Sequence, residues 1–239
     1  MKLDELINLK TNNKHSGLSI SALVPMKGHS ERIPGKNLRP LAGKPTCHWI
    51  LESLSKSKYI NQIVVDTDDD ELAECVSIFP KVKLIKRPSF LLGDMVSIQP
   101  LIEYDMKQSE DEYFIQTHCT NPLLSTATID KAIELFFSQK EHDALFGVTE
   151  VKSRFYWPNG KGINHDPQKL IRTQDLKPIF EENSCIYVFS RDTNLKTQNR
   201  LGSNPLMFPI DRLESADIDD MEDFYWCEYL LNRIIDGKV

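Results

Sequence analysis

Short apolar runs alternate with amphipathic helical patterns over the first 150 residues, and this alternation constrains the fold more than any other feature of the chain. The apolar runs predict strands at residues 19–26, 61–69, 81–88, 113–116 and 144–151. Helical patterns occupy most of the intervals between them. A chain that alternates in this way forms a parallel sheet with helices on both faces. We therefore expect an α/β fold with a doubly wound, mainly parallel sheet.

Three helices are predicted between these strands. The first begins at Pro45, a residue suited to the first helical turn, and carries Cys47, Leu51 and Leu54 on one face. The other two lie at about 71–79 and 128–139, where apolar residues recur at spacings of three or four. Each helix thus has one apolar stripe to place against the sheet.

The pattern changes after residue 151. Residues 152–184 are rich in polar, proline and aromatic residues, 184–190 predict a further strand, and 191–209 are expected to be a loop. The last helix is indicated by apolar residues at helical spacing: Phe224, Cys227, Leu231 and Ile234. We expect a polar N-terminal extension over residues 1–17 and one domain over residues 18–239.

Charge and cysteine content limit the function classes. The 239 residues include 29 Lys and Arg against 35 Asp and Glu, a net charge of −6, which disfavours nucleic acid or a membrane surface as partner. No apolar stretch predicts a signal peptide or a membrane span. Five cysteines without a CxxC pair indicate reduced thiols in a cytoplasmic protein and not a disulfide or zinc framework.

The loop after the first strand concentrates positive charge. Residues 27–37 contain Lys27, Arg32 and Lys36 together with two glycines. Glycines allow the backbone to approach a ligand, and successive N–H groups can bind an anion. In parallel sheets, ligands bind at the carboxyl edge of the strands, where this loop would lie. The loop therefore predicts a polyphosphate site, although a solvated basic surface loop would have the same composition. Neither GxxxxGK[ST] nor GxGxxG is present.

Two aspartates near the C-terminus form a second candidate site. In an extended segment, Asp217 and Asp219 would place both carboxylates on one side, as a Mg²⁺ site requires. The alternative is that Asp219 and Asp220 cap the last helix. Spacing alone favours neither.

The segment VPMKGHSERIPGKNLRPLAGKP (24–45) resembles the opening signature of the acylneuraminate cytidylyltransferase family, I-P-A-R-x-x-S-x-x-I/L-P-x-K-N followed by L-x-G-K-P. Further matches follow in the family's order: IVVDTDDDELAE, KRPSFLLGDMVS, FIQTHCTNPLL, DLKPIFEENSCIYVF and ESADIDDMEDF. Together they span about residues 20–235. The resemblance implies a nucleotidyltransferase fold of the GT-A-like, Rossmann-like type.

The chain departs from the family pattern at several positions. Lys27 and Glu31 stand where the family has arginine and lysine, Thr173 replaces a second arginine, and Ser184 replaces a glycine. Two extra residues follow Gln116. These changes keep open which acid sugar would be used.

The resemblance implies a set of site residues. Nucleotide binding falls on Lys27, Gly28, Ser30, Lys36, Asn37, Arg87 and Ser97, and sugar binding on Gln116, Arg172, Gln174 and Asn183. Mg²⁺ falls on Asp217 and Asp219, and the catalytic set is Lys27, Lys36, Asp217 and Asp219. The implied reaction transfers CMP from CTP to a sialic-acid-like 2-keto-3-deoxy acid sugar. Alternatives are a legionaminate-, pseudaminate- or Kdo-like sugar, or a non-catalytic nucleotide-sugar-binding protein.

The resemblance also implies a homodimer in which a lobe at about 151–205 reaches over the partner's site. Aromatic residues in this lobe (Phe155, Tyr156, Trp157 and Phe180) suit an interface, where aromatic anchors contribute most of the binding energy.

Overall fold

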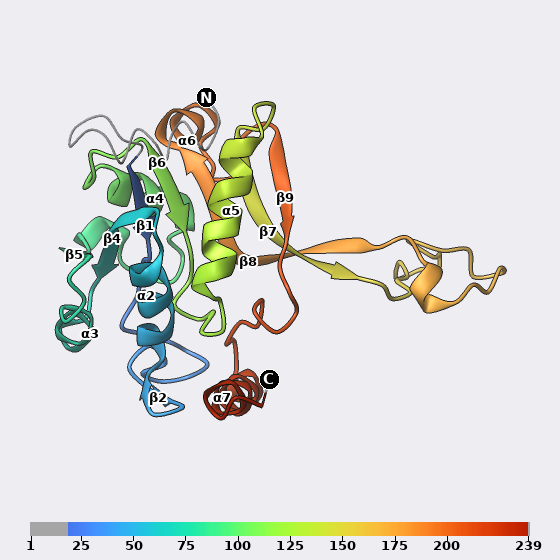
Figure 1. The fold of residues 1–239 in the computed structure, drawn as a ribbon, viewed down its shortest axis with the longest axis horizontal. Helices are drawn as coiled ribbons and strands as arrows, with labels where there is room; N and C mark the ends of the chain where they lie inside the picture. The colour runs from blue at the N-terminus through green and yellow to red at the C-terminus, as the bar shows by residue number, and fades with distance from the viewer. Residues whose placement is uncertain (1–18, 239) are drawn as a thin grey trace.

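A seven-stranded sheet forms the centre of the computed structural model, which describes residues 19–238 (Figure 1). The predicted extension over residues 1–17 lies outside the described residues. The strand order is β5-β4-β1-β6-β8-β7-β9. The strands are β1 (Ile20–Leu23), β4 (Ile60–Thr67), β5 (Val82–Lys86), β6 (Tyr113–Gln116), β7 (Ala144–Val151), β8 (Ile179–Ser190) and β9 (Pro205–Pro209).

Most neighbouring strands are parallel, as predicted. β1 pairs in parallel with both β4 and β6, β4 with β5, and β7 with β9. β8 runs antiparallel to both of its neighbours, β6 and β7. A separate two-stranded ribbon, β2 (Pro40–Leu41) and β3 (Lys44–Pro45), precedes the first long helix.

Helices cover both faces of the sheet. They are α2 (Thr46–Lys56), α3 (Asp70–Val76), α4 (Ile98–Met106), α5 (Thr126–Ser138), α6 (Arg191–Thr197) and α7 (Met221–Ile235). The larger core packs α2, α3 and α5 on one face, and the core containing Ile102 and Met106 of α4 lies on the other. Along β1, Ala22 enters the first core and Leu23 the second, because successive strand residues point to opposite faces. The doubly wound α/β fold is thereby confirmed.

The prediction of a loop over residues 191–209 was wrong. α6 begins at Arg191 after the N-cap Ser190, whose hydroxyl accepts a hydrogen bond from the N–H of Thr193. β9 lies at the edge of the sheet and has a proline at each end. Its pairing with β7 stabilises a segment whose local sequence does not favour a strand, since proline is tolerated mainly at sheet edges.

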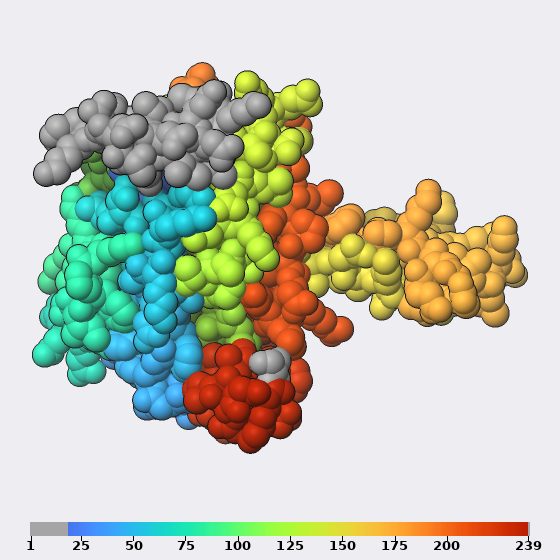
Figure 2. Space-filling view, viewed as in Figure 1, coloured from blue at the N-terminus to red at the C-terminus, as the bar shows by residue number. Residues whose placement is uncertain are grey.

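β7 and β8 continue beyond the body of the molecule as a projecting arm (Figures 1 and 2). Residues 152–178 form its tip, which includes the short 3₁₀ helix η2 (Thr173–Asp175). β8 starts five residues before the predicted strand over 184–190, and its extra length belongs to this arm. The tip of the arm thus lies within residues 151–205, where the lobe is expected.

A β-bulge marks the place where the arm joins the body. The register between β7 and β8 shifts between Phe146 and Val148, and Ser184 on β8 has φ = 57°. This left-handed conformation favours glycine, which is the residue that the family pattern has here. Opposite it, a Cβ on Gly147 would lie 2.6 Å from Oδ1 of Asn183, so the strands approach closely. The bulge turns the Ser184 side of β8 toward the cavity described next.

Candidate active site

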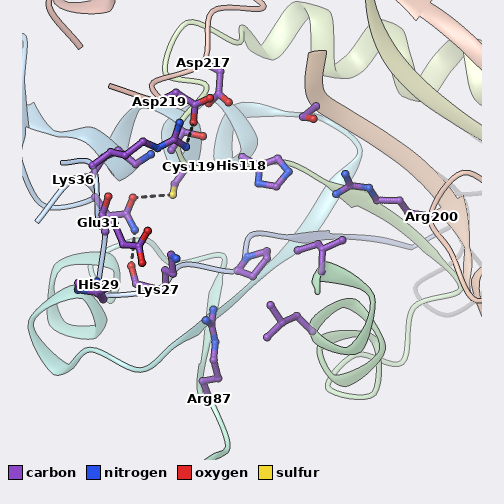
Figure 3. Close-up of a pocket in the computed structure, with 18 residues that line it drawn as sticks. Lys27, His29, Glu31, Lys36, Arg87, His118, Cys119, Arg200, Asp217 and Asp219 are labelled. Atoms are coloured by element: carbon purple, nitrogen blue, oxygen red, sulfur yellow. Dashed lines mark hydrogen bonds and ion pairs between the residues drawn. The ribbon is translucent and has the colours of Figure 1, made fainter. Parts of the chain in front are cut away.

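A cavity of about 480 Å³ opens at the carboxyl ends of β1, β5 and β6 (Figure 3). Its walls come from the loop after β1, the loop after β6, the start of α4, the β8 bulge and the segment before α7. Such a volume accommodates a nucleotide-sized ligand. The lining includes seven of the thirteen predicted site residues: Lys27, Ser30, Lys36, Asn37, Arg87, Asp217 and Asp219.

The loop after β1 is held by hydrogen bonds within itself and to two other segments. The amide of Asn37 donates to the carbonyl of Lys27 (2.9 Å), and Nζ of Lys36 donates to the carbonyl of Ile218 (2.7 Å). The backbone N–H of Gly28 donates to Oδ1 of Asp68 (2.7 Å), so Gly28 anchors the loop instead of lining the cavity. Lys36 thereby connects the basic loop to the acidic segment before α7.

Two cations of this loop form exposed ion pairs. Nζ of Lys27 lies 2.6 Å from Oδ1 of Asp94, and Nη2 of Arg32 lies 2.5 Å from Oδ1 of Asp219. All four side chains are more than 40% exposed, so water screens these pairs and each contributes little to stability. Their cations are therefore available to an incoming anion at low cost.

Asp217 and Asp219 lie in the segment that precedes α7. Asp220 caps that helix, in a capping box with Asp223, so the cap role considered for Asp219 belongs to its neighbour. Burial and the nearby charge of Asp219 raise the pKa of Asp217, against the opposing effects of Thr120 and Lys36. Its Oδ1 atom is buried and has no hydrogen-bond partner in the described part of the chain. A buried carboxylate oxygen without a hydrogen-bond partner suits a hard cation as its ligand.

Arg87 is fixed in the cavity wall by a buried ion pair. Its Nε lies 2.5 Å from Oδ2 of Asp66, and the two side chains are 6% and 0% exposed. Asp105 of α4 lies beside them. Burial and then the charge of Asp66 raise the pKa of Asp105 to about 9, so this carboxyl is protonated at neutral pH. Burial raises the pKa of Asp66 as well, and Arg87 opposes that shift.

The far end of the cavity holds His118 and Arg200, which are not among the thirteen predicted site residues. Arg200 donates a hydrogen bond to Oε1 of Gln116, and Nε2 of Gln116 lies 3.2 Å from Nε2 of His118. Burial, together with the charges of Arg200 and Lys36, lowers the pKa of His118 to about 4. His118 is therefore a neutral imidazole between two cations. Its place in the loop after β6 was a signal that could have identified it.

The remaining predicted residues do not line this cavity. Ser97 is exposed and immediately precedes α4, and Gln116 is fully buried behind the wall. Asn183 donates to the hydroxyl of Thr149 (3.1 Å) within the β8 bulge. Arg172 and Gln174 lie on the arm, where Arg172 pairs with Asp175 (2.7 Å).

Comparison with known proteins identifies the family. The family model described as cytidylyltransferase matches residues 21–231. The chain belongs to the cytidylyltransferase family. It is thus a nucleotidyltransferase enzyme, and the resemblance recognised from the ordered motifs is confirmed.

Several named proteins are similar to this chain. Post-translational flagellin modification protein B of Campylobacter coli is 26% identical over 90% of this chain and 95% of its own length. Pseudaminic acid cytidylyltransferase of Campylobacter jejuni is 25% identical over 87% and 94%. N-acylneuraminate cytidylyltransferase of Streptococcus agalactiae is 24% identical over 84% of this chain, which spans 51% of that protein.

Two solved structures share the fold. CMP:2-keto-3-deoxy-manno-octonic acid synthetase in complex with CTP has a TM-score of 0.68 at 16% identity, covering 90% of this chain and 99% of that one. 4-Diphosphocytidyl-2C-methyl-D-erythritol synthase of Anaerococcus prevotii has a TM-score of 0.64 at 13% identity, covering 90% and 96%. At these identities the likeness concerns the fold, which is that of a nucleotidyltransferase.

We predict that Asp105→Asn stabilises the protein at neutral pH. The folded-state pKa of about 9 lies above the ordinary value of 3.8, so the stability contributed by this carboxyl is complete below pH 3.8 and is lost as the pH rises toward 9. An amide does not ionise. The variant should therefore gain about 1 kcal/mol or more over the wild type at pH 8, and much less at pH 4.

Denaturant midpoints measured at pH 4, 6 and 8 would check this expectation. Glu110→Gln, at an exposed position after the same helix, is the control and should show no such trend. If the wild type were more stable than Asp105→Asn at pH 8, Asp105 would have to be ionised in the folded protein.

Proposed function

We propose that this enzyme transfers CMP from CTP to a 2-keto-3-deoxy acid sugar of the sialic acid type and releases pyrophosphate. The observation that carries the proposal is the pairing, in one cavity, of a basic loop with two aspartates in a chain of the cytidylyltransferase family. The names of the relatives, which include N-acylneuraminate and pseudaminic acid cytidylyltransferases, support an acid sugar as acceptor.

The basic loop would bind the triphosphate of CTP. Lys27 and Lys36 are the cations assigned to the departing pyrophosphate, and Ser30 and Asn37 complete that side of the cavity. To contact phosphate, Lys27 leaves Asp94 and Arg32 leaves Asp219, which exchanges weak exposed ion pairs for charge-assisted contacts with the ligand. Arg87, held by Asp66, would frame the nucleoside part together with the Ser97 end of α4.

Asp217 and Asp219 are the residues that would hold Mg²⁺. The buried, unpartnered Oδ1 of Asp217 and the exchangeable ion pair of Asp219 fit this role. When bound, the ion neutralises phosphate charge and lowers the cost of deprotonating the attacking sugar hydroxyl. The protein's own contribution is to orient the hydroxyl in line with the α-phosphorus and to keep cations beside the leaving group.

The arm suggests a homodimer. Tyr156 and Trp157 are 50% and 55% exposed on it, although large aromatic side chains tend to be covered. Arg172 and Gln174, remote from the cavity of their own subunit, would then reach the acid sugar in the partner's cavity. Gln116 and Asn183 would support the sugar side from behind the wall.

Since its five cysteines are free, we assign the enzyme to the cytoplasm. No helix within residues 19–238 combines the length and apolarity needed to cross a membrane.

A pyrophosphate-release assay tests the proposal. CTP, UTP, ATP and GTP are each combined with N-acetylneuraminate, legionaminate, pseudaminate and Kdo. We expect pyrophosphate release with CTP and at least one acid sugar. The preferred sugar then shows whether the substrate is a sialic acid or one of the legionaminate-, pseudaminate- or Kdo-like alternatives. No release with any pair would refute the function.

Two lysines provide a matched pair of variants for the same assay. Lys36→Ala should lower kcat by about 10²–10³, the usual cost of losing one contact to developing charge. Lys44 is paired with Glu52 (2.6 Å) and lies over the ring of Trp49, outside the cavity. Lys44→Ala should therefore leave kcat within a few-fold of the wild type. Equal losses would place the pyrophosphate elsewhere.

We predict that Asp217→Asn or Asp219→Asn abolishes turnover while CTP affinity changes only modestly. A carboxamide keeps the size of the side chain but lacks the charge that Mg²⁺ requires. Calorimetric titration of Mg²⁺ in the presence of CTP should show weaker binding in both variants. Asp220→Asn, which keeps a capping side chain, is the control. Turnover within threefold of the wild type in both variants would contradict the metal role.

We predict that light scattering gives about twice the chain mass of 27.5 kDa. Trp157→Ser on the arm should weaken the dimer, because aromatic anchors contribute most to such interfaces. Trp226→Ser on α7 is the matched control, since Trp226 is exposed to a similar extent, 52% against 55%. A monomer at all concentrations, or dissociation by Trp226→Ser alone, would exclude the arm as the contact.

A further inference from the structure

Arg200 is a largely buried cation whose charge is not matched by a close carboxylate. Its side chain is 16% exposed, and the nearest acidic contact is with Glu182 at 4.0 Å. Glu182 is 42% exposed and also accepts a hydrogen bond from the hydroxyl of Tyr187. By contrast, the buried Arg87 has a carboxylate at 2.5 Å. A buried charge without a close counter-ion is costly, which favours an anionic ligand as its partner.

The guanidinium of Arg200 is held in a fixed orientation. It lies 3.5 Å from the centroid of the Tyr187 ring, and it donates a hydrogen bond to Oε1 of Gln116. The amide of Gln116 is oriented in turn, because its Nε2 donates to the carbonyl of Thr117 (3.0 Å). Stacking and one hydrogen bond fix the plane of the guanidinium and leave other N–H groups for the cavity that Arg200 lines.

Arg200 and the basic loop occupy opposite sides of the cavity. Figure 3 shows Lys27 and Lys36 on one side, Arg200 on the other and His118 between them. Burial lowers the pKa of His118, and the charges of both Arg200 and Lys36 lower it further. The cavity thus has two separate positive regions, and a triphosphate held by the basic loop leaves the second without an anion.

We propose that Arg200 binds the carboxylate of the acid sugar within the same subunit. This inference rests on the proposed function. A planar guanidinium matches a carboxylate through two parallel hydrogen bonds, which a lysine cannot reproduce. The carboxylate would complete the charge balance of Arg200 and place the sugar between Arg200 and Asp217. Arg200 is thereby a specificity-determining residue that selects acid sugars over neutral ones.

The test compares acid and ester substrates in variants at this position. Pyrophosphate release is measured with the acid sugar that the wild type prefers, N-acetylneuraminate or pseudaminate, and with its carboxyl methyl ester. Arg200→Gln should raise KM for the acid at least about tenfold, as expected for a lost charge-assisted contact. KM for CTP should change less than twofold. KM for the acid in Arg200→Lys should lie between those of the wild type and Arg200→Gln, since lysine keeps the charge but cannot donate two parallel hydrogen bonds.

The ester distinguishes recognition from mere support of the fold. In the wild type, KM for the ester should exceed KM for the acid by about the factor seen for Arg200→Gln, whereas in that variant the two values should converge. If Arg200 only supported the fold, Arg200→Gln would change KM for the acid and KM for the ester by the same factor. Arg212→Gln, at an exposed arginine outside the cavity, is the matched control and should behave as wild type.

Each outcome has a defined meaning. If the ratio of KM for the ester to KM for the acid is the same in Arg200→Gln as in an active wild type, the role of Arg200 is overturned. The proposed function is left intact. Equal use of acid and ester by the wild type also overturns it, whether or not the variant folds. A wild type that releases pyrophosphate with no acid sugar overturns both proposals.

Discussion

Every part of the site depends on the pairing of β1 with β4 on one side and β6 on the other. These parallel ladders continue past the strand end, where the N–H of Met26 donates to the carbonyl of Asp66 (2.9 Å) and that of Thr117 to the carbonyl of Leu23 (3.2 Å). Three chain segments therefore leave the sheet at the same level. The basic loop, the Asp66–Arg87 pair and the loop containing His118 meet because β1 fixes this level.

The close ion pairs around the cavity fall into two groups that differ in exposure. The ion pair of Asp66 with Arg87 is buried, so breaking it would strand a charge in the protein interior. The pairs of Lys27 with Asp94 and of Arg32 with Asp219 are exposed and weak. The first group gives the cavity a fixed wall, and in the proposed function the second would let ligand phosphates replace protein carboxylates. The difference in burial thus makes the ion pairs of the basic loop easy to break, whereas Arg87 stays fixed.

The sequence predicted the parts of the fold whose signals are local. The strands over 113–116 and 144–151 match β6 and β7 because their apolar runs are bounded by polar turns. β9 was missed because its stability comes from pairing with β7, and its terminal prolines oppose a strand locally. The same limit applied to the site. Residues in ordered motifs, such as Lys36 and Asp217, were found, but Arg200 belongs to no motif and reaches the cavity only through the fold.

β8 connects the parts of the molecule that sequence reasoning treated separately. Its first residues belong to the arm, Ser184 of its bulge lines the cavity, and Tyr187 supports the guanidinium of Arg200. The strand passes from the arm to the sheet at Ser184, whose left-handed conformation favours the glycine of the family pattern. Because the strand is continuous, a partner that held the arm would also restrain the wall of the cavity. In the proposed dimer, assembly and sugar recognition would therefore be coupled through the backbone of β8.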